Sequence, residues 1–308
     1  MSPDCLHHNT PLLESRKISI AGSRVWLKIE AMQPAGSFKN RGVGAACQHY
    51  ASQGARHFVS SSGGNAGIAT AYAGQQLNIP VNVVVPRNAP ETAIAAMQEF
   101  GAGVEVNGDT WQEAHQRALS LVGDDSVVIH PFDDPILWPG HATLIDEVID
   151  SGVRPDAVVL SVGGGGLLCG IALGLTNHGL SDCPIIAVET EGAASLHGAI
   201  RNDAPFMLDR IETIANTLGA KQVCEQARAV TRSHDVHSYL VSDKQALDAC
   251  LRFRDQHRVL VEPACGAALS AVYEPPEVLN SIGNILVVVC GGMGVSDQQF
   301  KTWQAAVS

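Results

Sequence analysis

The chain has 308 residues, of which 45% are hydrophobic and 17% are charged, a composition typical of a soluble α/β protein with a sizeable core. Its formal net charge is −11 and its Lys and Arg residues are scattered, which argues against partners such as nucleic acid or an anionic membrane. Eight cysteines form no C-x-x-C pair and no zinc spacing, and the polar start shows no secretory leader. We therefore expect reduced thiols and a cytoplasmic protein.

Short apolar segments alternate with longer amphipathic ones along the chain. This alternation predicts an α/β fold in which parallel sheets are covered by helices on both faces. The expected strands are 24–30, 57–60, 81–86, 103–107, 126–129, 156–162, 184–189, 236–241 and 284–290. Expected helices include 40–52, 66–77, 90–100, 110–122, 166–178 and 243–257.

Two stretches depart from the simple alternation. Residues 157–175 carry no charge, but six of them are glycine, so a strand, a turn and a helix fit better than a membrane span. Residues 130–141, HPFDDPILWPGH, are rich in Pro and Asp and predict a crossing between two lobes. A ligand is then expected in the cleft between the lobes, at the carboxyl ends of the strands.

The segment PAGSFKNRG, residues 34–42, places Lys39 directly after an aromatic residue at the expected start of a helix. Both the neighbouring Phe38 and the helix N-terminus disfavour the ammonium form and lower the pKa of the amine. Such a lysine is nucleophilic enough to form a Schiff base with an aldehyde. The alternative is an ordinary surface lysine.

The segment SSSGGNAG, residues 60–67, follows an expected strand. Its hydroxyls, bare amides and single carboxamide gather at the carboxyl edge of that strand, where they suit a carboxylate or a phenolate oxygen. An ordinary turn is the alternative.

The segment SVGGGGLLCG, residues 161–170, joins an expected strand to an expected helix. Four consecutive glycines at a helix start favour anion binding by backbone amides. Glu189, at the end of the next strand, suits a dinucleotide fold, but the G-x-G-x-x-G spacing puts Leu168 or Cys169 where the last glycine belongs. The loop alone leaves a phosphate ligand, a nicotinamide cofactor and a structural turn open.

Together, the lysine segment, the Ser-Gly-Asn loop, the glycine loop and the late VVVCGG resemble the fold-type-II pyridoxal-phosphate enzymes, the tryptophan-synthase β-like family. Within it, PFDDPILWPGHAT, SVGGGGLLCG, VEPACGAAL and VVVCGG look most like the L-serine dehydratases and L-threonine deaminases of animal type. The resemblance runs from about residue 10 to 300. It implies two lobes with the cofactor between them, each an open, mainly parallel twisted sheet flanked by helices. The large cofactor-binding domain is expected at 1–38 plus 137–308 and the small domain at 39–136.

The resemblance also implies roles for single residues. Lys39 would form the Schiff base with pyridoxal 5′-phosphate and move the α-proton of the substrate. Phe38 would pack on the pyridine ring, Asn65 would bind the ring hydroxyl oxygen and Cys290 would face the ring nitrogen. The phosphate would be held by Gly163, Gly164, Gly165, Gly166 and Leu167, and the substrate carboxylate by Ser62, Gly64, Asn65 and Ala66.

The implied reaction is β-elimination of L-serine to pyruvate and ammonia, and of L-threonine to 2-oxobutyrate. Serine racemases carry a Ser, which moves a proton, at the position of Gly63. The glycine here cannot do so. Cysteine synthases differ at Leu167 and Cys290, and biosynthetic threonine deaminases commonly append a regulatory domain. The remaining alternatives are a threonine-preferring deaminase, another lyase of this fold and a cofactor-binding protein without activity.

Glu189 acquires another role from the resemblance. The family places a monovalent cation such as K⁺ near the phosphate helix, and the matching positions are Glu189, Ala193, Ser195, Leu218 and Ala220. The alternative is an acid that caps the next helix. The family also implies a homodimer that acts on a small amino acid.

Overall fold

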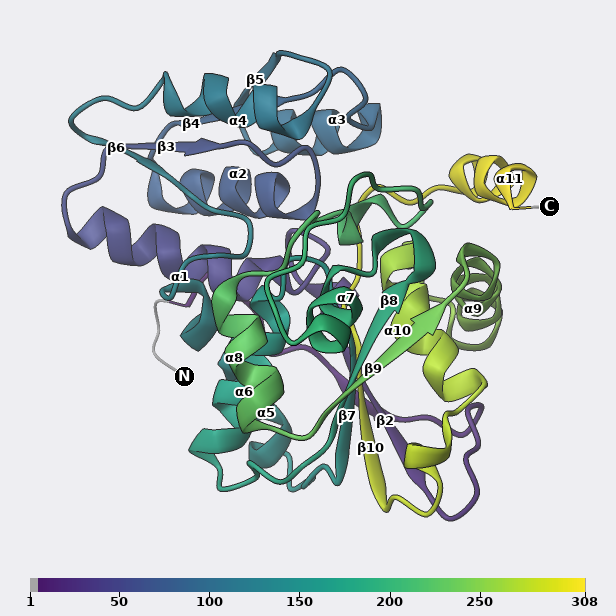
Figure 1. The fold of residues 1–308 in the computed structure, drawn as a ribbon. Coiled ribbons are helices and arrows are strands. Elements are labelled where there is room, and N and C mark those ends of the chain that lie inside the picture. Colours follow the sequence, from purple (N-terminus) through teal and green to yellow (C-terminus); the bar gives the residue numbers. More distant parts are fainter. Residues whose placement is uncertain (1–4, 308) are drawn as a thin grey trace.

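Two separate β-sheets organise the chain, for which the computed structural model describes residues 5–307 (Figure 1). The larger sheet has six strands in the order β1-β2-β10-β7-β8-β9, and all neighbours are parallel except β1 and β2. Its strands are β1 (Leu12–Glu14), β2 (Arg24–Ile29), β7 (Ala157–Ser161), β8 (Ile185–Thr190), β9 (Val236–Val241) and β10 (Asn284–Val289).

The smaller sheet has four strands, all parallel, in the order β5-β4-β3-β6. They are β3 (His57–Ser60), β4 (Val81–Val85), β5 (Gly103–Val106) and β6 (Ser126–Val128). Side chains alternate between its two faces, as a pleated strand requires. Phe58 and Val83 pack with the residues of α1–α3, whereas Val59 and Val84 pack with α4.

Helices cover both sheets. Around the smaller sheet lie α1 (Lys39–Ser52), α2 (Asn65–Leu77), α3 (Glu91–Glu99) and α4 (Trp111–Leu119). In Figure 1, α5 (Leu137–Asp150), α6 (Gly166–Asn177) and α8 (Glu225–Ser233) lie on one side of the larger sheet, and α9 (Asp243–His257) and α10 (Pro263–Tyr273) lie on the other. The remaining helices are α7 (Ser195–Asn202), α11 (Asp297–Ala306) and the short 3₁₀ turns η1 (Glu30–Met32), η2 (Glu191–Ala193), η3 (Asn216–Leu218) and η4 (Glu277–Leu279).

The predicted α/β class with mainly parallel sheets is confirmed, and all nine expected strands form. Strand β1 was not predicted, because three residues of an edge strand leave too short a pattern. The crossing segment ends earlier than expected, since α5 already begins at Leu137. The uncharged stretch 157–175 divides into β7, a glycine loop and α6. Among residues 5–307, no helix has the length and hydropathy of a membrane span.

The division into domains stays a proposal. All strands of the smaller sheet fall within 39–136 and all strands of the larger sheet fall outside it. Residues 1–4 and 308 of the proposed large domain lie outside the described part of the chain.

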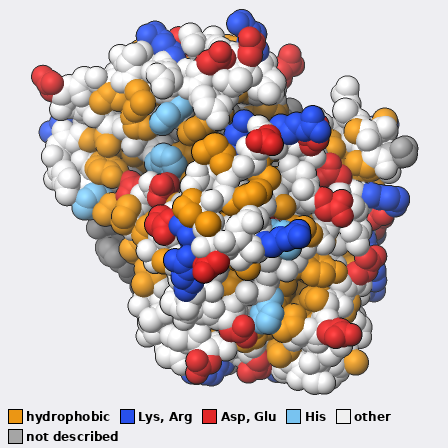
Figure 2. Space-filling model, in the orientation of Figure 1, with side chains coloured by type: hydrophobic (Ala, Val, Ile, Leu, Met, Phe, Trp, Pro, Cys, Tyr) orange, Lys and Arg blue, Asp and Glu red, His pale blue; other side chains and the backbone are white. Residues whose placement is uncertain are grey.

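On the face drawn in Figure 2, acidic and basic side chains are interspersed, in keeping with their scattered positions in the sequence.

Two strands that are far apart in the sequence, β2 and β10, are neighbours in the larger sheet. Strand β10 pairs in parallel with β2 over six positions, from Asn284 beside Arg24 to Val289 beside Ile29. Beyond the paired strands, the N–H of Phe38 donates to the carbonyl of Cys290 at 3.1 Å. The start of α1 is therefore fixed beside the carboxyl end of β10.

A buried ion network holds the first turns of α1 in place. The Arg41 side chain is fully buried, and its guanidinium makes two hydrogen bonds to Glu30, at 2.7 and 2.8 Å, and two to Glu147, both at 2.7 Å. Lys28 also donates to Glu147, at 2.5 Å. Burial alone would raise the pKa of Glu147, but the hydrogen bonds from Arg41 and Lys28 lower it below its usual value. The network joins α1 to β2, η1 and α5.

We predict that Arg41→Leu lowers the free energy of unfolding by about 3–5 kcal/mol, because it leaves two buried carboxylates without their shared partner. Arg87→Ala is the control, since its ion pair with Asp109 is exposed and should contribute little. Urea unfolding of the two variants gives the comparison. An Arg41→Leu protein as stable as the control would show that the network does not stabilise the fold.

Candidate active site

Lys39 is the first residue of α1 and lies where the two sheets approach each other. Two backbone hydrogen bonds tie the residues just before Lys39 to the segment after β10. The N–H of Phe38 donates to the carbonyl of Cys290, and the N–H of Gly292 donates to the carbonyl of Gly36 at 2.9 Å. The Lys39 Nζ lies 5.0 Å from the centre of the Phe38 ring and donates a short hydrogen bond to the carbonyl of Pro131. The amine thus contacts the segment that links the two sheets.

Burial of the Lys39 amine lowers its pKa to about 8, and negative charge on Cys290, Glu262 or Cys224 would act in the opposite direction. Desolvation disfavours the ammonium because a charge in a poorly solvated site loses its hydration. About a tenth of such an amine is uncharged at pH 7, far more than for a solvated lysine. The lowered pKa predicted for this lysine is supported, with burial as its main cause.

The four glycines form the bend between β7 and the first turn of α6. Gly165 has a left-handed φ of +95°, and a Cβ there would lie 2.4 Å from the Cβ of Ala227. A Cβ on Gly164 would lie 2.2 Å from the ring of Phe132, and one on Gly163 would approach the backbone of Leu218 to 3.2 Å. Side chains at Gly164 and Gly165 would collide with their neighbours, so the chain can follow this path only with glycine at these two positions.

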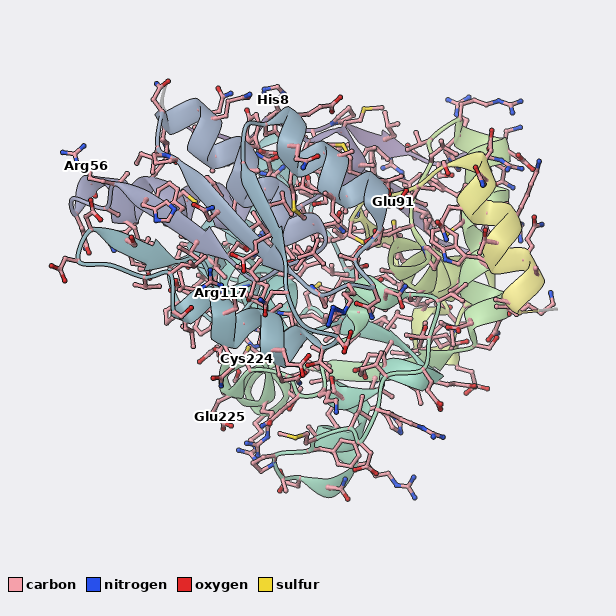
Figure 3. All side chains as sticks on the ribbon, turned by 90° about the horizontal axis from the view of Figure 1, so that it is seen from above. His8, Arg56, Glu91, Arg117, Cys224 and Glu225 are labelled. Carbon is pink, nitrogen blue, oxygen red and sulfur yellow. The ribbon has the colours of Figure 1, made fainter. Side chains whose placement is uncertain are left out.

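The loop of Gly163–Gly166, here called the glycine cradle, fits a phosphate group. Residues 162–168 contain no Lys or Arg, so an anion there would be held by backbone N–H groups and the helix dipole. The N–H of Cys224 donates to the carbonyl of Gly164 at 3.0 Å and fixes the loop from the side of α8. Figure 3 labels Cys224 and Glu225 at the start of that helix.

Residues 130–136, which link the smaller sheet to α5, contact both the lysine and the glycine cradle. Pro131 accepts the hydrogen bond of Lys39, while the next residue, Phe132, lies against Gly164 and Gly166. His130 shapes this turn, since its Nδ1 accepts from the N–H groups of Phe132 and Asp133 at 3.3 and 2.7 Å. Burial lowers the pKa of His130 to about 4, which keeps this nitrogen available as an acceptor. The sequence did not indicate roles for residues 130–132 beyond a crossing.

The loop 60–66 also reaches this place. Asn65, the first residue of α2, is buried, and its Nδ2 donates to Glu262 Oε1 at 2.7 Å. Ser62 Oγ accepts from the N–H of Gly64 at 3.4 Å, and Ala66 follows in the first turn of α2. Ser61 pairs with His115 of α4 at 2.9 Å. The loop thus presents its amides at the N-terminus of a helix, which suits a carboxylate.

Glu262 was missed by sequence reasoning, although its segment VEPACGAAL helped to identify the family. It directly precedes Pro263, the first residue of α10. Burial raises its pKa to about 7, although the hydrogen bonds from Thr217 and Asn65 act to lower it. The one available signal was an acid inside an apolar segment directly before a proline at a helix start.

Cys290 follows the last residue of β10 and is buried. A hydrogen bond with Cys265 and burial raise the pKa of its thiol well above the usual value, so the group stays uncharged. Its backbone carbonyl holds Phe38, which places Cys290 beside the start of α1.

Glu189 caps α7. Its carboxylate accepts from the N–H groups of Leu196 and His197, both at 2.7 Å, and burial raises its pKa to about 7. This geometry matches the alternative that the sequence left open, a helix cap. However, the buried hydroxyl of Ser195 has no hydrogen-bond partner among the described residues. The other residues expected at a cation, Ala193, Leu218 and Ala220, can offer backbone carbonyls.

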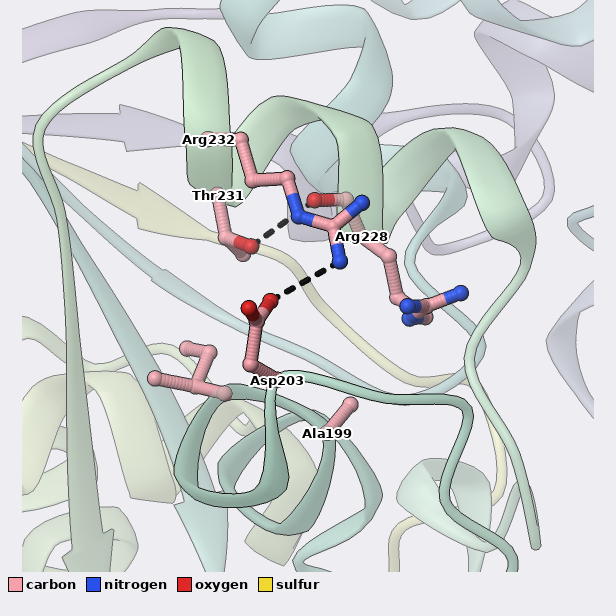
Figure 4. Close-up of a pocket in the computed structure, with 6 residues that line it drawn as sticks. Ala199, Asp203, Arg228, Thr231 and Arg232 are labelled. Carbon is pink, nitrogen blue, oxygen red and sulfur yellow. Dashed lines mark hydrogen bonds and ion pairs between the residues drawn. The ribbon is translucent and has the colours of Figure 1, made fainter.

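A surface hollow of about 120 Å³ lies elsewhere, between α7 and α8 (Figure 4). It is lined by Ala199, Ile200, Asp203, Arg228, Thr231 and Arg232. Arg232 donates to Asp203 at 2.8 Å across it, so its charges are already paired. None of its residues belongs to the lysine segment, the glycine loop or the loop 60–66.

Comparison with known proteins gives matches over nearly the whole chain. A family model described as "Pyridoxal-phosphate dependent enzyme" matches residues 6–291. The chain is 44% identical to the L-serine dehydratase/L-threonine deaminase of Mus musculus, over 97% of this chain and 95% of that protein. It is 42% identical to the L-serine dehydratase of Dictyostelium discoideum, over 96% and 91%. A solved L-serine ammonia-lyase from the fungus Rhizomucor miehei superposes with a TM-score of 0.93, at 31% identity, over 97% of this chain and 98% of that one.

We predict that, in protein freed of any bound aldehyde, the reaction of Lys39 with an amine-directed reagent reaches half its maximal rate near pH 8. Below that pH the ammonium form protects the amine, and above it the neutral form reacts. Mass spectrometry of the Lys39 peptide gives the profile, and the peptide with the exposed Lys244 corrects for the reagent's own pH dependence. A Lys39 profile that rises only above pH 10 would contradict the lowered pKa of this amine.

Proposed function

The chain belongs to the family of pyridoxal-phosphate dependent enzymes, and we propose that it catalyses the β-elimination of L-serine to pyruvate and ammonia. L-Threonine, which would give 2-oxobutyrate, is proposed as a second substrate. The observation that carries this proposal is a lysine of lowered pKa whose amine contacts Pro131, while the next residue, Phe132, packs against the glycine cradle at the start of α6. Similarity over nearly the full length to an L-serine dehydratase/L-threonine deaminase and to an L-serine ammonia-lyase supports it.

Pyridoxal 5′-phosphate would be held at four points. Its aldehyde carbon would be bound by Lys39 as a Schiff base, and its phosphate by the backbone of Gly163, Gly164, Gly165, Gly166 and Leu167. Asn65 would donate to the ring hydroxyl oxygen, and the ring of Phe38 would pack beside the pyridine. The place of these glycines at the N-terminus of α6 supports the phosphate position, because backbone N–H groups and the helix dipole favour an anion there.

When bound, the cofactor withdraws electrons from the α-carbon of the amino acid joined to it, which makes the α-proton acidic. The chain supplies the base for that proton. Lys39, with a pKa of about 8, has a sizeable uncharged fraction near neutral pH and can take up the proton at Nζ. The carbonyl of Pro131 keeps this amine oriented through its hydrogen bond.

The substrate carboxylate would lie against Ser62, Gly64, Asn65 and Ala66. The amides at the start of α2 and the hydroxyl of Ser62 supply donors, and the helix dipole favours an anion there. Cys290 would face the ring nitrogen. Because its thiol stays uncharged, it would leave that nitrogen without the proton that a carboxylate partner would stabilise.

Two features bear on the alternatives. Gly63 carries no hydroxyl with which to move a proton on the opposite face, which disfavours racemisation. A Cβ at this position would lie 3.0 Å from the Cβ of Ala89, so the loop is closely packed here. One methyl group distinguishes serine from threonine and is worth about 1–3 kcal/mol in a fitted pocket, so we expect both to react.

We also propose that Glu189, Ala193, Ser195, Leu218 and Ala220 hold a monovalent cation such as K⁺. The unpartnered hydroxyl of Ser195 and the buried carboxylate of Glu189 support this site. We further propose that the protein is a homodimer and lies in the cytoplasm. The eight cysteines are all free, which suits a reducing compartment.

We predict that Lys39→Ala lowers the release of pyruvate and ammonia from L-serine by on the order of 10³-fold or more, because it removes both the attachment point and the base. Borohydride reduction of the wild-type protein, followed by peptide mapping, should place the cofactor on Lys39. Lys244→Ala is the control. A label on any other lysine, or full activity of Lys39→Ala, would refute the assignment.

We predict that exchange from potassium into tetramethylammonium buffer lowers the turnover of L-serine and that potassium restores it. In Glu189→Gln this cation dependence should be weakened, because the charged ligand is lost. If Glu189 only caps α7, the variant loses stability but the wild-type rate is the same in both buffers. Rates in the two buffers, together with the thermal midpoints of both proteins, distinguish these results.

A further inference from the structure

The carboxylate of Glu262 joins residues that come from different parts of the molecule. Its Oε1 accepts two hydrogen bonds, from Asn65 Nδ2 at 2.7 Å and from Thr217 Oγ1 at 2.6 Å. Asn65 opens α2 beside the smaller sheet, whereas Thr217 lies in η3 and Glu262 directly before α10, both with the larger sheet. Glu262 therefore connects the loop 60–66 to the other half of the fold.

The orientation of the Asn65 carboxamide follows from these contacts. A carboxylate oxygen can only accept hydrogen bonds, and the only donor of the Asn65 side chain is its NH₂ group. The NH₂ end of Asn65 must therefore face Glu262. The other end, Oδ1, accepts from the N–H of Met293 at 3.4 Å. The two ends of the side chain are thereby held by Glu262 and by Met293, which follows β10, and the second N–H of Nδ2 makes no hydrogen bond to any described residue.

Glu262 is itself firmly placed. It is buried, and a Cβ on Gly292 would lie 2.3 Å from its Oε2, so that only glycine leaves room for the second oxygen. Gly292 also has a φ of +129°, which favours glycine. The Glu262 carboxylate is thus confined between Asn65, Thr217 and Gly292 and has little freedom to turn away.

We propose that Glu262 is the positioning residue for Asn65: it orients the carboxamide toward the cofactor ring and ties the substrate-binding loop to the larger sheet. The proposal rests on the proposed function, since it assumes a cofactor at Asn65. Glu262 acts through Asn65 and takes no part in the reaction itself. Burial raises its pKa, and any proton it carries belongs on Oε2, because Oε1 already accepts two hydrogen bonds.

The test is a mutant cycle with cofactor affinity as its readout. Apoprotein of wild type, Glu262→Ala, Asn65→Ala and the double variant is titrated with pyridoxal 5′-phosphate and followed by fluorescence. A lost hydrogen bond to a charged group corresponds to about a ten- to hundred-fold change, so Glu262→Ala should weaken binding by about that factor. Because Glu262 acts through Asn65, the double variant should bind no more weakly than Asn65→Ala.

Two further variants sharpen the test. Glu262→Gln keeps an acceptor toward Asn65 and Thr217 and should regain most of the affinity that Glu262→Ala loses. The absorbance maximum of the bound cofactor should shift alike in Glu262→Ala and Asn65→Ala, which a loss of stability alone would not cause. If Glu262→Ala does not fold, Glu262→Asp serves in its place, since it keeps the charge but withdraws it from Asn65. Glu99→Ala, an exposed acid on α3, is the control.

Unchanged affinity in Glu262→Ala, or losses that multiply in the double variant, would overturn the proposal. Failure of the proposed function gives a different result: wild-type protein would then bind no pyridoxal 5′-phosphate, or would release no pyruvate from L-serine. Wild-type protein that does both, together with an unaffected Glu262→Ala, rejects only the role of Glu262.

Discussion

The bidentate pairing of Arg41 with both Glu30 and Glu147 is the constraint on which the candidate site depends. Arg41 lies two residues after Lys39 on the same helix, so whatever fixes its guanidinium also fixes the first turn of α1. An isolated buried charge would be costly, but here two carboxylates accept four hydrogen bonds from one rigid, planar cation. The start of α1 is therefore held in a fixed position against β2 and α5.

The path of the chain explains why distant segments meet at this point. The first strands join the larger sheet, the chain leaves to build the smaller one, and residues 130–136 bring it back to α5. Because β2 and β10 are parallel neighbours, the segments that follow them emerge at the same edge. One leads to Lys39 and the other to Cys290, while the returning segment places Pro131 and Phe132 between the lysine and the glycine cradle.

Local patterns predicted most of the fold and the parts of the site that lie within one segment. The glycines 163–166 stand between an apolar strand and an apolar helix, and Lys39 stands at a helix start, so both positions could be singled out from their neighbours. Their expected roles came from the resemblance of several segments taken together, because each segment alone left a structural turn or a surface lysine open. Glu262 could not be singled out, because its partner Asn65 is 197 positions away and no periodicity links them. Glu189 was ambiguous for a similar reason: a carboxylate at a strand end is compatible with a helix cap and with a cation, and the hydrogen bonds that define the cap come from the fold. The edge strand β1 was too short to leave any pattern.

Burial acts in opposite directions on the two charged groups of the site. It lowers the pKa of Lys39 to about 8 and raises that of Glu262 to about 7, while each group's charge partly opposes the shift of the other. Near neutral pH both groups are consequently close to the point at which they lose their charge. Solvent exposure would leave Lys39 an ammonium ion, unable to accept a proton, and Glu262 a hydrated carboxylate with no preference for Asn65. The same desolvation that makes the lysine a usable base also makes the carboxylate's hydrogen bonds to Asn65 and Thr217 strong, because little water competes for them. Basicity and orientation in this site are therefore two consequences of one property, the desolvation of these two groups.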